Sequence, residues 1–243
     1  MTVDHGFGIT GFIRTSFLDW PGKICSVIFL AGCNFRCPAC HNAALVAQSD
    51  TRPEYPIDEI VRYLEKRKGW IDGVAVTGGE PTIRKNLPEL LRLLRQTGTK
   101  IKLDTNGYNP AMLSHVISSQ LIDAVAMDVK APLTSTEYSR VTGTPLNIRL
   151  IKRSIEIIKE SKLETTFRTT VIPHLVEERQ LSEIRNFLGK VKNYKVQSFR
   201  NEETLDPSFS GLEEFSLERV EKMRRDFEIP SLDIGLDERA CAG

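Results

Sequence analysis

The chain has 243 residues, with 33 Lys and Arg against 32 Asp and Glu, so its formal net charge is +1. This balance gives no sign of a nucleic-acid or membrane-surface partner, and we expect neither. No apolar run approaches the roughly 18 residues that span a bilayer, and the opening MTVDHGFGIT lacks the features of a signal peptide, so we expect a cytoplasmic protein.

Apolar β-branched runs alternate with amphipathic stretches along the chain. The predicted strands cover residues 23–32, 71–79, 99–107, 122–132, 163–173 and 193–199. The predicted helices cover residues 58–70, 86–98, 109–120, 147–161, 177–190 and 216–227, and a polar loop is expected over 133–146. Six strand-then-helix units predict a parallel sheet with right-handed crossovers.

Six units are too few for a closed eight-stranded barrel. The expected fold class is therefore α/β: an open, partial TIM-type (β/α)6 barrel of parallel strands with helices outside, or else a doubly wound sheet. No change in composition marks a domain boundary. We expect a single domain over residues 1–243, with its core at 20–200 and a C-terminal extension at 201–243.

Unusual residues follow each predicted strand at its carboxyl end. In chain order they are Cys33, Cys37 and Cys40, then TGGEP at 77–81, DTNG at 104–107, MDVK at 127–130, Arg168 with Thr169, and Gln197. In both candidate folds, ligands bind at the carboxyl edge of the strands. Six polar elements are therefore expected to converge on one site.

The spacing C-x-x-x-C-x-x-C places three thiols in one short loop. In a cytosolic chain, cysteines indicate metal binding or catalysis rather than disulfides, and thiolates select zinc or iron–sulfur clusters. A zinc site completed by His41 is disfavoured, because adjacent Cys40 and His41 reach one ion poorly. A four-iron cluster normally has four cysteine ligands, so three would leave one iron open for a small molecule. Cys25 lies inside a predicted strand and is expected in the core, and Cys241 lies in the tail.

This cysteine motif after the first strand, with GGEP after the second, resembles the radical S-adenosylmethionine (SAM) enzymes. The resemblance implies a radical SAM domain with one [4Fe-4S] cluster on Cys33, Cys37 and Cys40, and SAM bound through its amino and carboxylate groups to the fourth iron. In that family an electron from the cluster cleaves SAM and releases a 5′-deoxyadenosyl radical. A flavodoxin- or ferredoxin-type protein is the implied electron donor.

The longer stretch TSFLDWPGKICSVIFLAGCNFRCPACHN, residues 15–42, resembles a narrower group, the glycyl-radical-enzyme activases. Within that group the chain resembles first the activating proteins of anaerobic ribonucleoside-triphosphate reductase and second those of pyruvate formate-lyase. The resemblance runs over roughly residues 8–200. It implies that the chain installs a glycyl radical on a partner glycyl radical enzyme, expected to be anaerobic ribonucleotide reductase.

The resemblance also implies a role for the segment after the second strand. Gly78, Gly79 and Glu80 correspond to residues that hold the amino group of SAM. A glycine pair lets backbone carbonyls approach a ligand closely, and a carboxylate accepts a charge-assisted hydrogen bond from an ammonium group. Taken alone, GGEP is more often a strand-to-helix turn, but after this cysteine loop the functional role is favoured.

Two further strand ends have implied roles beside structural alternatives. Asp104, Thr105 and Asn106 correspond to a segment near the methionine part of SAM and, in relatives, a monovalent cation; DTNG alone is also an Asx-type turn. Asp128 and Lys130 correspond to polar residues near the ribose and carboxylate, or else form a strand-end cap and a solvated lysine.

Three single positions complete the expected site. Arg168 is a candidate carboxylate clamp, because its planar guanidinium suits that task, or else part of a structural ion pair. Asp19 matches the acidic residue of the family's D-G-P-G segment near the substrate glycine loop, with Trp20 in place of the first glycine. Ala39 stands where the family usually has an aromatic residue, so His41 is the candidate for stacking on adenine.

Three functional classes stay open. The first is an activase, and we expect the glycine loop of its partner to pass Asp19 and Trp20 through the lateral gap of an open barrel. The second is a radical SAM enzyme with a small-molecule substrate, such as a 7-carboxy-7-deazaguanine synthase. The third, a non-catalytic iron–sulfur electron carrier, is disfavoured because a carrier would need a fully ligated cluster.

Overall fold

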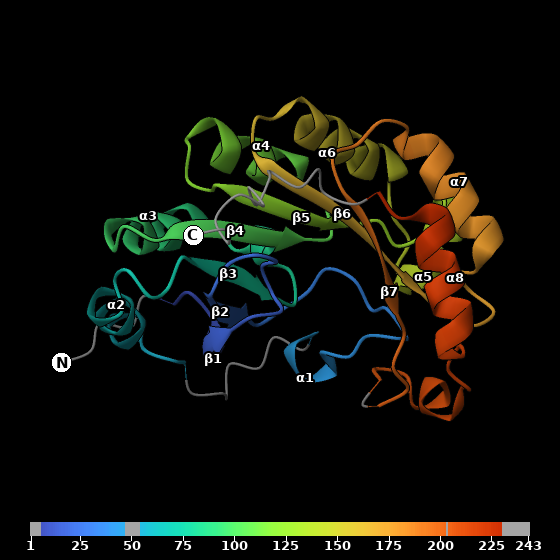
Figure 1. Cartoon of the computed structure of the whole chain (residues 1–243), viewed down its shortest axis with the longest axis horizontal. Coiled ribbons are helices and arrows are strands. Elements are labelled where there is room, and N and C mark those ends of the chain that lie inside the picture. The colour runs from blue at the N-terminus through green and yellow to red at the C-terminus, as the bar shows by residue number, and fades with distance from the viewer. Residues whose placement is uncertain (1–5, 47–53, 203, 230–243) are drawn as a thin grey trace, which may run out of the picture.

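The computed structural model describes residues 6–46, 54–202 and 204–229, and its centre is one seven-stranded sheet. The strands are β1 (Ile9–Ser16), β2 (Cys25–Leu30), β3 (Gly73–Gly78), β4 (Lys100–Thr105), β5 (Ala124–Asp128), β6 (Glu164–Val171) and β7 (Tyr194–Ser198). They lie side by side in chain order, from β1 to β7. Figure 1 shows them fanned into a curved sheet with helices along the outer side.

The sheet confirms the expected partial barrel. Strands β2 to β7 are all parallel, which gives the six predicted units. The strand order never reverses, whereas a doubly wound sheet has a point of reversal, so that alternative is wrong. The seventh strand, β1, was not predicted. It pairs antiparallel with β2 at the edge of the sheet, and its sequence ITGFIRTS is mostly half-buried or exposed, so it lacks a continuous apolar run.

The helices connect the strands on the outer side. They are α1 (Ala43–Val46), α2 (Ile57–Lys66), α3 (Leu87–Gln96), α4 (Pro110–Ser118), α5 (Ser135–Thr142), α6 (Ile148–Glu160), α7 (Glu178–Leu188) and α8 (Leu217–Phe227), with short 3-10 turns η1 (Pro81–Ile83) and η2 (Pro207–Gly211). No helix among the described residues is long and apolar enough to cross a membrane.

Helix α5 corrects the expectation of a polar loop over 133–146. The Thr134 side chain caps its first turn by accepting a hydrogen bond from the Glu137 backbone N–H at 3.3 Å. Gly143 ends it in the left-handed conformation that favours glycine. The helix contributes only a few apolar side chains to the core, among them Tyr138 and Val141, so its sequence STEYSRVT has too little apolar periodicity to be recognised.

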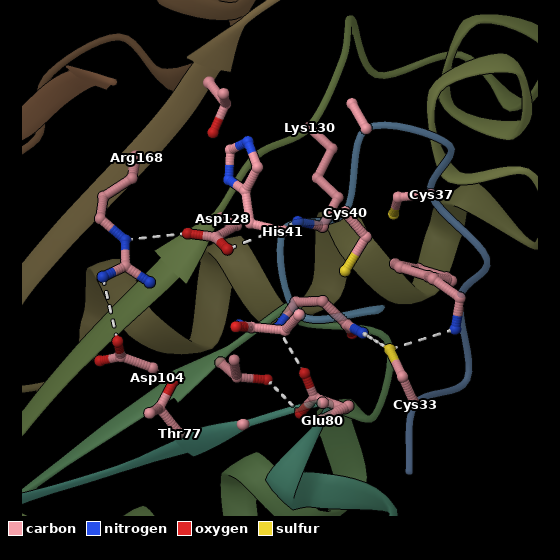
Figure 2. A pocket seen from close by; sticks show the side chains of 18 of the residues that line it. Cys33, Cys37, Cys40, His41, Thr77, Glu80, Asp104, Asp128, Lys130 and Arg168 are labelled. Atoms are coloured by element: carbon pink, nitrogen blue, oxygen red, sulfur yellow. Dashed lines mark hydrogen bonds and ion pairs between the residues drawn. The ribbon is translucent and has the colours of Figure 1, made fainter. Parts of the chain in front are cut away.

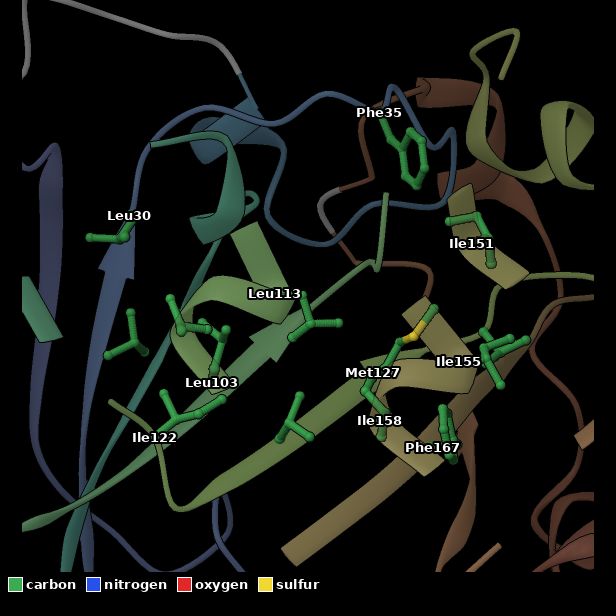
Figure 3. Packing of buried hydrophobic residues seen from close by; sticks show 14 of the residues in the cluster. Leu30, Phe35, Leu103, Leu113, Ile122, Met127, Ile151, Ile155, Ile158 and Phe167 are labelled. Carbon is green, nitrogen blue, oxygen red and sulfur yellow. The ribbon is translucent and has the colours of Figure 1, made fainter. Parts of the chain in front are cut away.

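The main core lies between the sheet and these outer helices. Leu103 of β4, Met127 of β5 and Phe167 of β6 pack there, as Figure 3 shows. Helix α6 contributes a stripe that includes Ile151, Ile155 and Ile158, spaced at i, i+4 and i+7, which puts all three on one helical face. Burial of this kind holds the helices against the sheet and thereby fixes where each strand ends.

The two edges of the sheet are not paired with each other in the described residues. The β7 edge is covered by the end of the last helix: Glu228 accepts a hydrogen bond from the Val196 backbone N–H at 2.9 Å, and Tyr194 exchanges backbone hydrogen bonds with Ile229. The β1 edge is contacted near its start, where the Tyr55 backbone N–H donates to the Ile9 carbonyl at 2.7 Å, and near its end, where the Thr15 and Tyr63 hydroxyls lie 3.2 Å apart. The barrel is therefore open along one side.

Candidate active site

A cavity of about 320 Å³ reaches from the carboxyl ends of the strands into the barrel. Its volume lies at the lower end of the roughly 300–1,000 Å³ typical of small-molecule sites. All fifteen residues predicted from the sequence line it: Asp19, Cys33, Cys37, Ala39, Cys40, His41, Gly78, Gly79, Glu80, Asp104, Thr105, Asn106, Asp128, Lys130 and Arg168. The structure thus brings the predicted residues together (Figure 2), while their binding roles remain predictions.

The sequence analysis did not predict some of the residues that line the cavity, and it named Thr169 where the neighbouring Thr170 lines it. The missed residues are Phe29, Phe35, Asn42, Val46, Val141, Thr170 and Ile172. Thr169 was expected at the site, but its side chain is buried outside the cavity and donates to the Val129 carbonyl at 2.7 Å. Side chains alternate along a strand, so Thr170, two residues after Arg168, faces the cavity instead. Counting two residues along the predicted strand from Arg168 could have identified Thr170 from the sequence.

Backbone contacts fix the shape of the cysteine loop. The Phe35 backbone N–H points at the Cys33 sulfur at 3.4 Å, and the Cys40 backbone N–H donates to the Cys37 carbonyl at 3.0 Å. The Phe35 ring is buried and packs against Tyr108, with 5.4 Å between ring centroids. A buried aromatic ring between two of the thiols therefore anchors a loop that has no helix or strand of its own.

The segment after β7 holds the same loop from the other side. The Leu205 backbone N–H donates to the Cys40 carbonyl at 3.1 Å. His41 Nε2 lies 2.7 Å from the Arg200 carbonyl oxygen, and the imidazole stacks on Phe199 with 5.7 Å between centroids. His41 is thus fixed by two contacts, while its side chain still lines the cavity that Ala39 also lines.

Burial affects the acidity of the thiols. It raises the pKa of Cys33, and it raises that of Cys37 to about 11. A thiol with a raised pKa stays protonated at neutral pH, and a coordinating metal displaces that proton. Cys33 and Cys37 therefore depend on a bound metal to become thiolates.

The thiol arrangement fits a cluster better than a single ion. Within residues 6–46, 54–202 and 204–229, no three His, Cys, Asp or Glu side chains converge closely enough to hold one metal ion. His41, the candidate fourth ligand of a zinc site, lies instead with Nε2 at 2.7 Å from the Arg200 carbonyl oxygen. A cluster places each cysteine on a different iron, so its ligands need not meet at one point. Cys33, Cys37 and Cys40 share one cavity wall, and Cys25 is buried in the core, as expected.

Gly78 and Gly79 let the turn after β3 pack against the start of the cysteine loop. A Cβ at Gly78 would overlap the Leu30 backbone, and one at Gly79 would overlap the Gly32 carbonyl. The Gly79 and Glu80 backbone N–H groups donate to the Leu30 and Gly32 carbonyls, each at 2.8 Å. The close approach that requires glycine is thus, in this structure, an approach to protein backbone.

The Glu80 carboxylate is buried, with 1% of the residue exposed. Its Oε1 accepts hydrogen bonds from the Thr82 backbone N–H at 3.1 Å, the Thr82 hydroxyl at 2.5 Å and the Thr105 hydroxyl at 2.7 Å, and Oε2 accepts from the Asn106 backbone N–H at 2.7 Å. Burial raises the pKa of Glu80, and these donors oppose that rise. The carboxylate therefore joins the GGEP and DTNG turns, and only Oε2 has room for a further donor.

Asn106 continues this connection to the cysteine loop. Its Nδ2 donates to Asn34 Oδ1 at 2.7 Å and lies 4.0 Å from the Cys33 sulfur. Asn34 was not singled out from the sequence, because an asparagine between two cysteines has many possible roles. The three turns after β2, β3 and β4 therefore form one hydrogen-bonded unit.

Charged residues cross the barrel interior below the thiols. Arg168 Nε donates to Asp128 at 2.8 Å, and its Nη1 donates to Asp104 at 3.0 Å (Figure 2). Lys130 pairs with Asp128 at 3.4 Å, and Lys102 with Asp104 at 2.7 Å. Burial alone would raise the pKa of Asp128, but Arg168 and Lys130 lower it overall. Arg168 thus forms ion pairs with carboxylates of its own chain, which is the structural role that the sequence analysis gave as its alternative.

Asp19 lines the cavity from the loop between β1 and β2. Its carbonyl accepts a hydrogen bond from Lys102 Nζ at 2.7 Å, which ties this loop to β4. Trp20 was expected beside Asp19 at the substrate entrance, but only 1% of it is exposed and it packs into the interior. The expectation for Trp20 was therefore wrong.

Comparisons with known proteins agree with this geometry. A model of the radical SAM superfamily matches residues 27–188. The "Putative glycyl-radical enzyme activating enzyme MJ1227" of Methanocaldococcus jannaschii is 29% identical over 208 residues, 84% of this chain and 85% of that protein. The pyruvate formate-lyase-activating enzyme of Clostridium pasteurianum is 24% identical over 222 residues, 89% of this chain and 86% of that protein. The structure of coproporphyrinogen III oxidase from Escherichia coli, described as a radical SAM enzyme, shares the fold, with a TM-score of 0.57 at 13% identity over 85% of this chain and 52% of that one.

Proposed function

The chain belongs to the radical SAM superfamily, and from this membership we propose that it is an activating enzyme that installs a glycyl radical on a partner protein. Anaerobic ribonucleoside-triphosphate reductase is the proposed partner. The observation that carries the proposal is a single cavity lined by Cys33, Cys37 and Cys40 at one end and by Asp19 at the other. Relatives that match most of the chain are named as activating enzymes, which supports the same substrate class.

When bound, the cluster and SAM would supply one electron and a cleavable carbon–sulfur bond. With the electron from a flavodoxin- or ferredoxin-type donor, this chemistry would remove one hydrogen atom from a glycine Cα of the partner. The products would be methionine, 5′-deoxyadenosine and a glycyl radical. Atoms and electrons therefore balance with one reductant electron and one SAM per glycyl radical.

The chain's own residues bind and orient these groups. Cys33, Cys37 and Cys40 would anchor three irons and leave the fourth for the amino and carboxylate groups of SAM. Backbone carbonyls at Gly78 and Gly79, with the remaining acceptor position of Glu80 Oε2, would receive the ammonium group of SAM.

Other wall residues would hold the rest of SAM. The His41 ring, already stacked on Phe199, offers an aromatic surface where the family's residue before the third cysteine is Ala39. Asp104, Thr105 and Asn106 are assigned to the methionine side with a monovalent cation, and Asp128 and Lys130 to the ribose and carboxylate. Arg168 then orients Asp104 and Asp128, to which it is hydrogen-bonded.

One observation favours a protein substrate over a small molecule. Phe17 and Leu18 immediately precede Asp19, and they are 70% and 89% exposed. Large exposed apolar side chains next to a cavity-lining residue suit a contact with another protein. The second candidate, a small-molecule radical SAM reaction, draws support from the charged interior around Arg168, which also suits a polar substrate.

An electron-paramagnetic-resonance experiment separates the two. The anaerobically reconstituted protein is mixed with SAM, a reductant and purified anaerobic ribonucleotide reductase or pyruvate formate-lyase. We expect the doublet of a glycyl radical on the reductase, with methionine and 5′-deoxyadenosine formed alongside. Efficient turnover of a free small molecule, with no radical on either candidate partner, would support the second candidate and contradict the first.

A further inference from the structure

The loop of residues 17–24, between β1 and β2, crosses the amino-terminal end of the barrel, opposite the cysteine edge. It turns tightly at Gly22, which has a φ of +75°, and the Lys23 backbone N–H donates to the Trp20 carbonyl at 3.0 Å. The turn sends the Trp20 side chain inward, where it forms a small second core with Cys25, Val27, Ala75 and Ala124.

Several of the residues around the Trp20 side chain begin a parallel strand. Cys25 is the first residue of β2, Gly73 of β3, Ala124 of β5 and Glu164 of β6. Because the amino-terminal ends of parallel strands meet at one end of a barrel, the indole lies across that end. Trp20 is thus the floor of the barrel below the cavity.

Polar contacts extend this floor to the far side of the sheet. Trp20 Nε1 donates to Glu164 Oε1 at 2.8 Å, and Lys23 Nζ pairs with Glu164 Oε2 at 3.0 Å. Lys23 Nζ also lies 4.9 Å from the centre of the indole ring. The loop belongs to one edge of the sheet, beside β1, whereas Glu164 begins β6, next to the last strand. The loop therefore connects the two sides of the open barrel at its base.

Gly73, the first residue of β3, leaves space for the Trp20 indole. A Cβ at Gly73 would lie 2.6 Å from Trp20 Cζ3, which is too close for any side chain there. Gly73 has no positive φ to explain its identity. A glycine at the start of β3 and a tryptophan in the preceding loop are therefore sterically matched.

Anchoring Trp20 also determines where its neighbour lies. Asp19 lines the cavity, and its carbonyl is held by Lys102 Nζ at 2.7 Å. With Trp20 buried on one side and Lys102 bound on the other, Asp19 has little freedom to leave the cavity wall.

We propose that Trp20 is a positioning residue that closes the floor of the barrel, limits how deeply a substrate segment enters, and holds Asp19 against that segment. The substrate part of this inference rests on the proposed function. The floor itself does not, so two experiments are needed.

Tryptophan fluorescence tests the floor without cluster, SAM or partner. The chain has two tryptophans, and Trp70 is 73% exposed, so Trp70→Phe leaves Trp20 as the sole tryptophan. In that background we expect blue-shifted emission that acrylamide quenches about tenfold less than free indole, as burial requires. Adding Glu164→Leu should increase quenching, and adding Glu164→Gln, which keeps an oxygen acceptor for Nε1, should not. Quenching of Trp20 equal to that of free indole would overturn the floor assignment.

Product partition tests the positioning role in the reconstituted full chain. The measurement is glycyl radical formed on the partner per 5′-deoxyadenosine released. Trp20→Phe and Glu164→Leu should lower this ratio about tenfold, less than the roughly 10²-fold that a 1 Å misplacement can cost. Glu164→Gln should retain most of it, and Trp70→Phe is the matched control at the exposed tryptophan.

The outcomes separate the inference from the proposed function. If Trp20→Phe and Glu164→Leu leave the ratio unchanged, the positioning role of Trp20 is overturned. It is also overturned if glycyl radical and 5′-deoxyadenosine both fall in proportion to the iron content. If Trp20→Phe does not fold, the pair Glu164→Leu and Glu164→Gln still decides the question. If no partner gains a radical, the proposed function fails while the fluorescence result on the floor stands.

Discussion

At the scale of single residues, the cavity wall combines the three thiols of the cysteine loop with the buried carboxylate of Glu80. Three thiols at fixed spacing have few possible uses, and so Cys33, Cys37 and Cys40 could be identified together from the sequence. The contacts of a glutamate are much less constrained by sequence. Glu80 was predicted to meet a ligand ammonium, whereas its carboxylate is hydrogen-bonded to Thr82, Thr105 and Asn106, whose positions depend on the tertiary structure.

The first prediction concerns the cluster ligands. Changing Cys33, Cys37 or Cys40 to Ala should abolish the iron–sulfur cluster, because each thiolate anchors a separate iron. Iron and sulfide analysis with visible absorption on anaerobically reconstituted protein measures this, and we expect about one four-iron cluster per chain in the parent. Cys25→Ala is the control and should keep its iron, since Cys25 is buried in the second core. Zinc at full occupancy without iron would contradict the radical SAM assignment.

The second prediction concerns Glu80. Glu80→Ala leaves buried donors at Thr82, Thr105 and Asn106 without an acceptor, at on the order of 1–3 kcal/mol for each unsatisfied group. We expect lower unfolding free energy and weaker SAM binding together, measured by urea unfolding and by equilibrium dialysis. Glu80→Gln keeps one oxygen acceptor and should lose less of both. Normal stability and SAM cleavage in Glu80→Ala would mean that the GGEP segment is only a turn.

At the scale of elements, apolar periodicity located the six parallel strands and most of the outer helices. It missed β1, which is an edge strand with one fully buried residue, and α5, which has too few apolar residues to show a period. It also could not place Trp20. A tryptophan in a loop is compatible with a surface contact or with burial, and only the approach of β3 at Gly73 and β6 at Glu164 decides between them.

The third prediction concerns the ion pairs that join β4, β5 and β6. The pKa of Asp128 is lowered in the folded state, so its carboxylate stabilises the fold at pH above the unfolded value of about 3.9 and loses that contribution as the pH falls. Asp128→Asn should therefore reduce the unfolding free energy at pH 7 by on the order of 1–2 kcal/mol, less than for a fully buried pair. The difference from the parent should narrow below about pH 4.

Anaerobic urea unfolding at the two pH values measures that difference. Asp226→Asn, at an exposed position on α8, is the matched control and should leave the unfolding free energy unchanged at pH 7. A deficit in Asp128→Asn that grows as the pH falls would contradict the assignment of Asp128 to a charged pair with Arg168.

At the scale of the whole molecule, the open side of the barrel is what a protein substrate requires. The cavity is lined by Asp19, which follows β1, and by Gln197 of β7, the two ends of the sheet. It therefore lies across the gap between the sheet edges. A closed barrel would admit only a small molecule from the carboxyl end, whereas this gap leaves a lateral path for a chain segment.

The last prediction follows from that path. A peptide with a central glycine, taken from the radical-bearing loop of the partner, should slow amide hydrogen exchange at residues 17–24 and 197–202 in the presence of SAM. At ten times its Kd the peptide adds about 1.4 kcal/mol of stability, so exchange there should slow roughly tenfold. Helices α2 and α3, on the outer face of the sheet, should be unaffected. A control peptide with glycine replaced by valine should protect less, because its side chain has to fit beside Asp19, where glycine presents only a hydrogen atom. Protection of α2 and α3 without any at residues 17–24 would show that the substrate does not enter between β1 and β7.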